Sequence, residues 1–329
     1  MHTLIKKVPI PIAGLALGLA ALGNLLQPYS DIPHAICGIA ALALVVLLGI
    51  KIALFPHMIR NDLRNSILAS VSATLFMALM QLATYLAPFA YGPAFALWGA
   101  AVAAHMILIG WFTLHFITRF KLREVFPTYF ICYVGIIVGS VTSPTFDMEP
   151  LGLVLFWFGF ACYAVLLGLV TYRYLKHEIP ESARPLFCIY AAPMSLSLTG
   201  YLAAEPTPNA VFVIVLLALA QILLVIVIGQ LPHFLRLSFY PSFAAMTFPF
   251  VISATAFGRS LSFFRAQGIA FPPAFDVLFV IETILATFMV TFVFVRYVFF
   301  LAKPAEQPQG ASAVHENAGI TRFSKSFYD

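Results

Sequence analysis

The chain has 329 residues, of which 62% are hydrophobic, 15% are aromatic and only 9% are charged. A soluble domain is usually about 45–50% apolar, and this chain has too few charged residues to cover a water-soluble fold of its size. Soluble enzymes, nucleic-acid-binding proteins and disordered regulators are therefore excluded, and basic cytoplasmic loops account for the formal net charge of +5.

The apolar residues form long, nearly unbroken runs such as Ile39–Ile50, Leu151–Val170 and Val211–Gly229. A membrane barrel would instead show strands of about ten residues that alternate between apolar and polar positions. The runs therefore predict an all-α polytopic membrane protein, whose backbone polar groups are paired within each helix.

Ten segments approach the length of about 20 apolar residues that a membrane span needs. The first follows Lys6 and Lys7 and also fits a signal peptide, but a retained helix is favoured because its removal would leave nine spans and break the pairing described below. In chain order the expected spans are Pro9–Leu26, His34–Leu54, Ile67–Leu86, Pro93–Thr118, Pro127–Val141, Leu151–Tyr174, Pro185–Ala203, Pro208–Gln230, Tyr240–Phe257 and Pro273–Phe300.

The basic residues indicate how these spans are oriented. Of the 18 Lys and Arg residues, only Arg259 and Arg265 fall on the side opposite the N-terminus. Because cytoplasmic loops carry the excess of Lys and Arg, both termini are expected in the cytoplasm. The expected location of the protein is the plasma (inner) membrane. Residues 1–302 form the membrane domain, and residues 303–329 are a polar cytoplasmic tail that we expect to be disordered.

The spans group into five hairpins, each with a short helix out and a long helix back. Several short helices begin at or near proline, which is tolerated in the first helical turn.

A basic residue precedes each short helix. If the hairpins encircle an axis, these residues form a ring that concentrates anions, although generally basic inward loops explain them as well. The ring candidates are Lys7, Arg64, Arg123, Arg184 and Arg236.

The short helices also carry hydroxyl side chains, which could line a narrow pore as weak hydrogen-bond donors. Close packing between membrane helices is an equally good explanation for such small residues. The pore-lining candidates are Ser72, Thr74, Ser140, Thr142, Ser195, Thr199, Thr247 and Ser253.

Short motifs carry a resemblance to a known family. Met246–Pro249 and Ser253–Phe257 in the ninth span resemble the ninth helix of the tellurite-resistance/dicarboxylate transporter family, which includes TehA and the plant slow-type anion channels. The glycine-rich segment Gly14–Gly23 resembles the first helix of that family. Its proline-bearing helices are similar to Ala192–Pro193 and to the span from Pro127 to Val141.

The resemblance implies ten helices in five hairpins, in a quasi-fivefold arrangement around a central pore, and a homotrimer with one pore in each protomer. It also implies that Phe248 closes the pore at mid-membrane, with Phe243 and Phe250 as local competitors. Pro249 cannot donate to the carbonyl of Ala245, so we expect a kink beside the gate.

Glu282 is the one acid expected deep in a span, the tenth. An acid at this depth is a functional candidate by default. Glu282 either carries protons or pairs with a polar neighbour, and we favour the structural pairing. No HExxH, GxSxG or Walker motif occurs, so no enzyme activity, cofactor or metal site is expected.

Two functions remain. The first is an anion channel or uniporter that passively conducts small inorganic or carboxylate anions across the lipid bilayer. The alternative is a secondary transporter for C4-dicarboxylates, sulfite or tellurite-related oxyanions, which would show broken helices and a midplane site. No nucleic-acid partner is expected.

Overall fold

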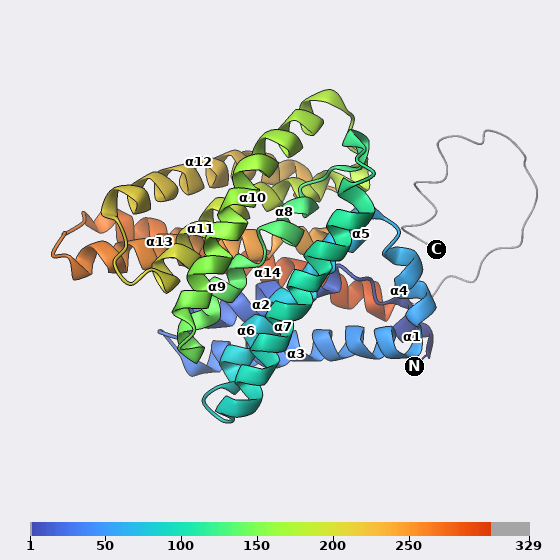
Figure 1. The fold of residues 1–329 in the computed structure, drawn as a ribbon, viewed down its shortest axis with the longest axis horizontal. Coiled ribbons are helices and arrows are strands. Elements are labelled where there is room, and N and C mark those ends of the chain that lie inside the picture. The colour runs from blue at the N-terminus through green and yellow to red at the C-terminus, as the bar shows by residue number, and fades with distance from the viewer. Residues whose placement is uncertain (1, 304–329) are drawn as a thin grey trace, which may run out of the picture.

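The computed structural model describes residues 2–303, and these residues form helices without any β-strand. The all-helical membrane fold predicted from the sequence is thus confirmed. Apart from Lys303, the predicted tail at 303–329 lies outside the described residues. The short helices α1 (His2–Lys7) and α4 (Pro56–Asp62) lie at one end of the bundle, and the turn between α13 and α14 lies at the opposite end (Figure 1).

Five long helices form the outer layer. Only 22–33% of the residues in their most apolar windows are buried, so most of their apolar side chains face outward, as lipid-facing side chains do. These helices are α3 (Asp31–Leu54), α7 (Tyr91–Phe112, continued by the π-helix η1, Thr113–Ile117), α10 (Glu149–Lys176), α12 (Ala210–Leu235) and α14 (Pro273–Ala302).

Five inner segments alternate with the outer helices along the chain. In the three that are long enough to compare, 67–83% of the residues in the apolar window are buried. The inner segments are α2 (Ile12–Leu26), α5 (Ser66–Val71) with α6 (Ala73–Leu86), α8 (Thr128–Tyr133) with α9 (Ile137–Thr142), η4 (Glu181–Ala191) with α11 (Ala192–Ala204), and η5 (Pro241–Met246) with α13 (Phe248–Ala266). The short 3-10 turns η2 (Leu122–Glu124) and η3 (Ser143–Phe146) flank the third segment.

The inner segments pack against one another in a closed order. Helix α2 contacts α6, α6 contacts α9, α9 contacts α11, α11 contacts α13, and α13 returns to α2. This ring encloses the axis of the bundle, so residues on its inner side are the candidates for a passage through the protein.

Within residues 2–303, eight helices are long and apolar enough to cross a membrane. The first expected span corresponds to the shorter α2, which has 15 residues. The fifth is interrupted at Val134–Ile136, between α8 and α9. At the interruption the Ile131 carbonyl oxygen lies so close to Gly135 that no Cβ would fit there. Only glycine, which has no Cβ, allows this close backbone approach, so Gly135 determines where the helix is interrupted.

The two ends of the described chain meet at the same end of the bundle. The Lys7 ammonium donates hydrogen bonds to the carbonyl oxygens of Phe300 (2.5 Å) and Lys303 (2.9 Å), at the end of α14. Nearby, the buried Lys51 ammonium donates to the Val8 carbonyl oxygen at 2.6 Å. Lysines at these positions satisfy carbonyls that a helix end and a turn would leave without partners.

Candidate functional site

A cavity of about 440 Å³, here called the near cavity, opens inside the ring on the side of α1 and the end of α14. All five inner segments contribute to its lining, which is mostly apolar. Representative lining residues, one from each segment, are Gly14, Thr74, Phe130, Leu186 and Phe248. The near cavity therefore lies on the axis that the inner helices enclose.

A second cavity of about 550 Å³, here called the far cavity, lies toward the opposite end. It is lined by the later turns of α2, α6 and α13, by the end of α9 and by the start of α14. Its lining includes amide and hydroxyl side chains, among them Asn24, Gln81 and Thr255, together with Arg259. The far cavity is thus more polar than the near one.

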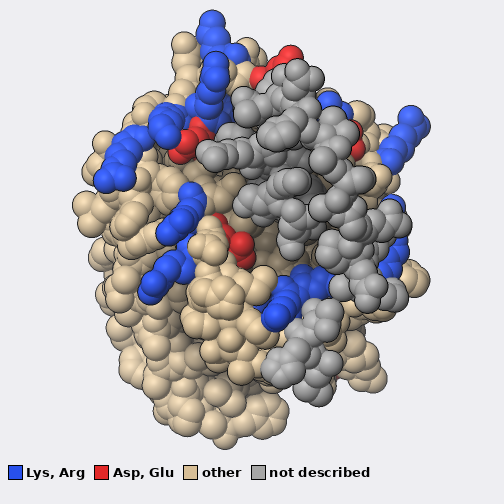
Figure 2. Space-filling view, turned by 90° about the vertical axis from the view of Figure 1, so that its right-hand side faces the viewer, with Lys and Arg blue, Asp and Glu red and all other residues tan. Residues whose placement is uncertain are grey.

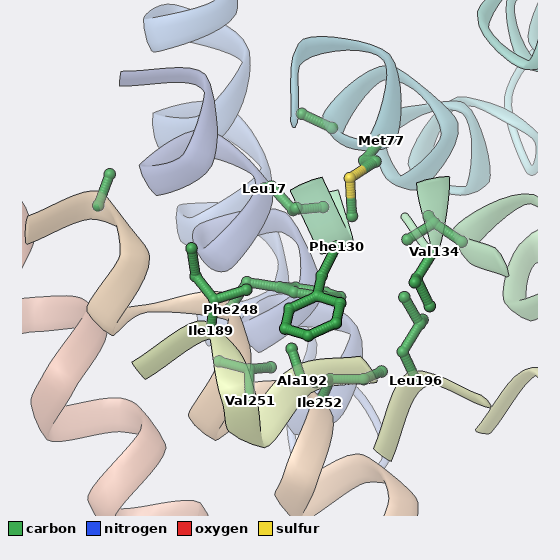
Figure 3. Close-up of a cluster of buried hydrophobic side chains, with 14 of the residues drawn as sticks. Leu17, Met77, Phe130, Val134, Ile189, Ala192, Leu196, Phe248, Val251 and Ile252 are labelled. Carbon is green, nitrogen blue, oxygen red and sulfur yellow. The ribbon is translucent and has the colours of Figure 1, made fainter. Parts of the chain in front are cut away.

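A group of buried apolar side chains, most of which line the near cavity, is here called the central cluster (Figure 3). Phe130 and Phe248 both point into it, and their side chains are only 1% and 6% exposed. The other labelled members are Leu17, Met77, Val134, Ile189, Ala192, Leu196, Val251 and Ile252. Two aromatic side chains from different inner segments therefore line the near cavity and belong to the same cluster.

Along α2, α6 and α13 the two cavities are separated by about one helical turn, which is about 5.4 Å of rise. Along α13 the near cavity ends at Pro249 and the far cavity begins at Ile252. Along α2 the corresponding residues are Leu17 and Ala21. The stretch between the two cavities is therefore short and apolar along these helices.

Phe248 is held in place by the backbone just before it. Thr247 has φ −108° and ψ −81°, outside helical values, and α13 begins at Phe248 with Pro249 in its first turn. The Thr247 hydroxyl lies within hydrogen-bond distance of two carbonyl oxygens, Ala244 at 2.7 Å and Gly14 of α2 at 3.2 Å. The expected kink in a continuous helix is thus corrected to a new helix start, where the missing N–H of proline does no harm.

The two local competitors lie elsewhere. Phe243 and Phe250 are 0% and 1% exposed, and neither lines the near or the far cavity. Their rings contribute to packing between helices, so within this segment Phe248 is the phenylalanine whose ring reaches the axis.

Most of the eight hydroxyl candidates lie between helices. The structure places Thr74 in the lining of the near cavity and Thr142 in that of the far cavity. The Ser140 hydroxyl of α9 donates to the Gly200 carbonyl of α11 (3.0 Å). The other candidates, which donate to backbone carbonyls, are Ser72, Ser195, Thr199, Thr247 and Ser253. These hydroxyls satisfy backbone carbonyls, because a buried hydroxyl without a partner is costly. Those of Ser140 and Thr247 also bridge neighbouring segments.

Replacing Thr142 with valine should lower the stability of the protein. The buried Trp98 indole donates to the Thr142 hydroxyl (2.8 Å), and valine leaves that donor without a partner, at a cost of about 1–3 kcal/mol. Thr199→Val is the matched control, because the Thr199 hydroxyl donates only to the carbonyl of Ser195 in its own helix. Thermal unfolding in detergent measures both variants, and equal melting temperatures would contradict the expectation.

The five basic candidates surround the near end without lining the near cavity. Figure 2 shows Lys and Arg side chains spread over this face, with acidic side chains among them. Lys7 binds the end of α14, and the Arg184 guanidinium lies 3.3 Å from His233. Arg64 lines a separate surface hollow, and Arg123 and Arg236 are exposed. Their long side chains reach carbonyls, neighbouring residues or solvent rather than the axis.

Glu181, in contrast, lies in the lining of the near cavity, at the start of η4. Its carboxylate accepts a hydrogen bond of 2.9 Å from the Tyr240 hydroxyl, which comes from the fifth inner segment. No other Asp, Glu, Lys or Arg lines this cavity within residues 2–303. An acid at this mouth opposes the attraction that the surrounding basic residues exert on anions.

Glu282 lies outside both cavities. Its side chain is 5% exposed, on α14. The carboxyl group lies near the Gln221 amide of α12, but neither of its oxygens has a hydrogen bond of normal geometry among the described residues. This position fits the structural reading better than a role in the passage.

Sequence reasoning missed Phe130, Glu181 and Tyr240. Phe130 is one of 33 phenylalanines, and no motif distinguishes it. In the loop that contains Glu181, the sequence pattern marks only the basic residue Arg184 as a site candidate. No signal in the sequence alone would have brought Glu181 and Tyr240 together, since 59 residues separate them.

Outer helices with exposed apolar faces surround a ring of inner segments, and this ring encloses a cavity. This arrangement defines a multi-pass membrane protein of the channel and transporter class. The family model described as voltage-dependent anion channel (SLAC1) matches residues 7–298 of the chain. The chain therefore belongs to this anion channel and transport family, which confirms the resemblance that the ninth-span motifs carry. No individual curated protein matches the chain.

Proposed function

We propose that the protein is a passive anion channel whose pore runs from the near cavity through the central cluster to the far cavity. The observation that carries this proposal is that Phe248 and Phe130 both line the near cavity, whose end lies about one helical turn from the far cavity along α2, α6 and α13. In this conformation the central cluster is a closed gate, and movement of the Phe248 ring opens it.

The lining supports conduction rather than tight binding. Among the described residues Glu181 is the only charged one that lines the near cavity, and the labelled side chains of the central cluster are all apolar. An anion is therefore bound weakly along this stretch and leaves quickly, as conduction requires. Small monovalent anions such as chloride and nitrate fit this lining best, and sulfite or C4-dicarboxylates are further candidates.

The proposal includes the arrangement in the membrane. The closed ring of inner segments and the alternation of buried and outward-facing helices support ten passes in five hairpins with quasi-fivefold order. The distribution of basic residues supports both termini in the cytoplasm and the plasma membrane as the location. The exposed apolar faces of the outer helices serve both lipid contact and a homotrimer, which chemical cross-linking in native membranes tests directly.

Reversal potentials in planar bilayers test the channel proposal. With purified protein and an anion gradient, the reversal potential should follow the anion gradient alone and should not respond to a pH gradient. Phe248→Ala should give the same reversal potentials with larger currents. A reversal potential that follows the cation gradient would contradict the proposal.

The alternative, a secondary transporter, has one observation in its favour. Several inner segments are interrupted or change helix type, for example at Val134–Ile136, at Thr247 and at the change from η4 to α11. Discontinuous helices mark many transporter sites. Uptake into liposomes separates the two functions. Saturable uptake driven by a second ion would support the transporter, and flux that follows the anion gradient alone supports the channel.

A further inference from the structure

The two arginines at the far end of the bundle differ sharply in their surroundings. Arg265 is paired, because its guanidinium donates hydrogen bonds to both carboxylate oxygens of Asp276, at 2.7 and 2.8 Å. Arg259, six residues earlier on α13, has no hydrogen bond, ion pair or ring contact within residues 2–303. Of these two positive charges, only that of Arg259 lacks a counter-charge.

The unpaired arginine lies in the far cavity. Arg259 lines this cavity and is accessible to solvent there. Since Arg265 and Asp276 also line it and neutralise one another, Arg259 supplies the net charge of the lining. A single positive charge in a concave site with low-dielectric walls attracts small anions more strongly than the same charge on an open surface.

The far cavity also offers uncharged donors. The Asn24 amide donates to the Gln81 carbonyl oxygen (2.7 Å) and to the Thr84 hydroxyl (3.3 Å), which fixes the orientation of both amides. The amide nitrogen of Gln81, itself 5% exposed, then has no partner within the described residues. A charged guanidinium and a free amide N–H₂ group are the types of donor that hold a small oxyanion.

We propose that the far cavity is an anion-binding site in which the Arg259 guanidinium and the Gln81 amide bind a small oxyanion such as nitrate or a short carboxylate. The site rests on the proposed channel function, because the anion held there is the one that crosses the central cluster. Arg259 follows Phe248 by 11 residues, which is about 16 Å along the helix axis. The site therefore supplies anions to the pore, and a substitution at Arg259 leaves the gate itself unchanged.

The test measures currents through the open Phe248→Ala background as a function of anion concentration. Arg259→Gln should lower nitrate current about tenfold at low ionic strength, because the variant loses a charged hydrogen-bond donor to the anion and little salt is present to screen that charge. Arg259→Lys should keep most of the current while losing part of the preference for nitrate over chloride, because lysine lacks the planar fork.

The matched control removes an arginine from the same cavity without changing its net charge. The double variant Arg265→Gln with Asp276→Asn should leave the current unchanged within about twofold, because the lost pair is neutral and exposed. An equal loss in Arg259→Gln and in the double variant would overturn the site, since the effect would then be structural.

Cysteine modification adds a readout that misfolding cannot mimic. In Arg259→Cys on the same background, a cationic thiol reagent applied from the far side should restore current, and an anionic reagent should reduce it further. The Phe248→Ala parent, treated with the same two reagents, controls for reaction at the four native cysteines, three of which are buried. Identical responses to the two reagents would overturn the site.

Direct binding separates failure of the site from failure of the channel proposal. Chloride-35 NMR line broadening, competed by nitrate, detects exchange of anions at purified protein without any conduction. Broadening that depends on Arg259 in a protein without anion current would retain the site and reject the channel. Anion current that is indifferent to Arg259→Gln would retain the channel and reject the site.

Discussion

Replacing Phe248 with alanine should raise the anion current by about 10- to 100-fold. In the proposed pore the Phe248 ring is a main part of the barrier between the two cavities, and its removal should let water enter the central cluster. Partial hydration of the passing ion lowers the barrier by about 1.4–3 kcal/mol, and each 1.4 kcal/mol is about a tenfold change in rate. Single-channel or macroscopic currents in planar bilayers measure the change.

Phe250→Ala is the control for this variant. It removes the same number of atoms two residues away, from a ring that is 1% exposed and lines neither cavity. We expect it to lower stability without raising current. Equal currents in the wild type and in Phe248→Ala, with both proteins folded, would show that the Phe248 ring does not close the pore. Phe130→Ala would then identify the second ring of the central cluster as the barrier.

Replacing Gly18 with alanine should destabilise the protein and displace the gate segment. A Cβ at Gly18 would lie 2.5 Å from the Thr247 hydroxyl oxygen, 2.6 Å from the Thr247 Cβ and 3.1 Å from the backbone nitrogen of Phe248. The nearest atoms are not the far end of a flexible chain, so α2 and the start of α13 must separate. Overpacking of this kind costs about 1–3 kcal/mol, and the melting temperature in detergent measures it.

Gly14→Ala is the control, one helical turn earlier on α2. Its added Cβ would meet the Ala244 side chain at 3.4 Å, an ordinary contact. Both substitutions gain the same helix propensity, about 0.5–1 kcal/mol, so the difference between them isolates the contact with Thr247 and Phe248. A melting temperature of Gly18→Ala equal to that of Gly14→Ala would contradict the close approach of these two segments.

Much of the fold could be predicted from hydropathy because hydropathy is a local property. The long runs such as Val211–Gly229 specify membrane helices whatever surrounds them, and the change between outer and inner helices follows from the shorter, proline-marked segments. Interruptions were harder to predict. The break at Val134–Ile136 depends on the carbonyl of Ile131 approaching Gly135, which hydropathy does not register.

The candidate site was predictable only in part, as Phe248 illustrates. Its motif, Met246–Pro249, indicated the residue, and the structure placed its side chain at the end of the near cavity. Ser140 and Ser195 are hydroxyl residues on short inner helices, the pattern expected of pore-lining residues, but their side chains lie between helices. An inner helix is apolar on every side, so its sequence has no amphipathic bias that distinguishes the axis from the neighbouring helix.

The sequence by itself therefore determined the class of protein, the order of its helices, the basic end and the family, because each follows from local composition or a short motif. Only the tertiary structure decided which side chains reach the axis. It placed Phe130 and Phe248 in the lining of one cavity and brought Glu181 to Tyr240. It also paired Arg265 with Asp276 and left Arg259 unpaired in the far cavity. These outcomes depend on how helices from distant parts of the chain rotate and pack against one another, and no single segment encodes them.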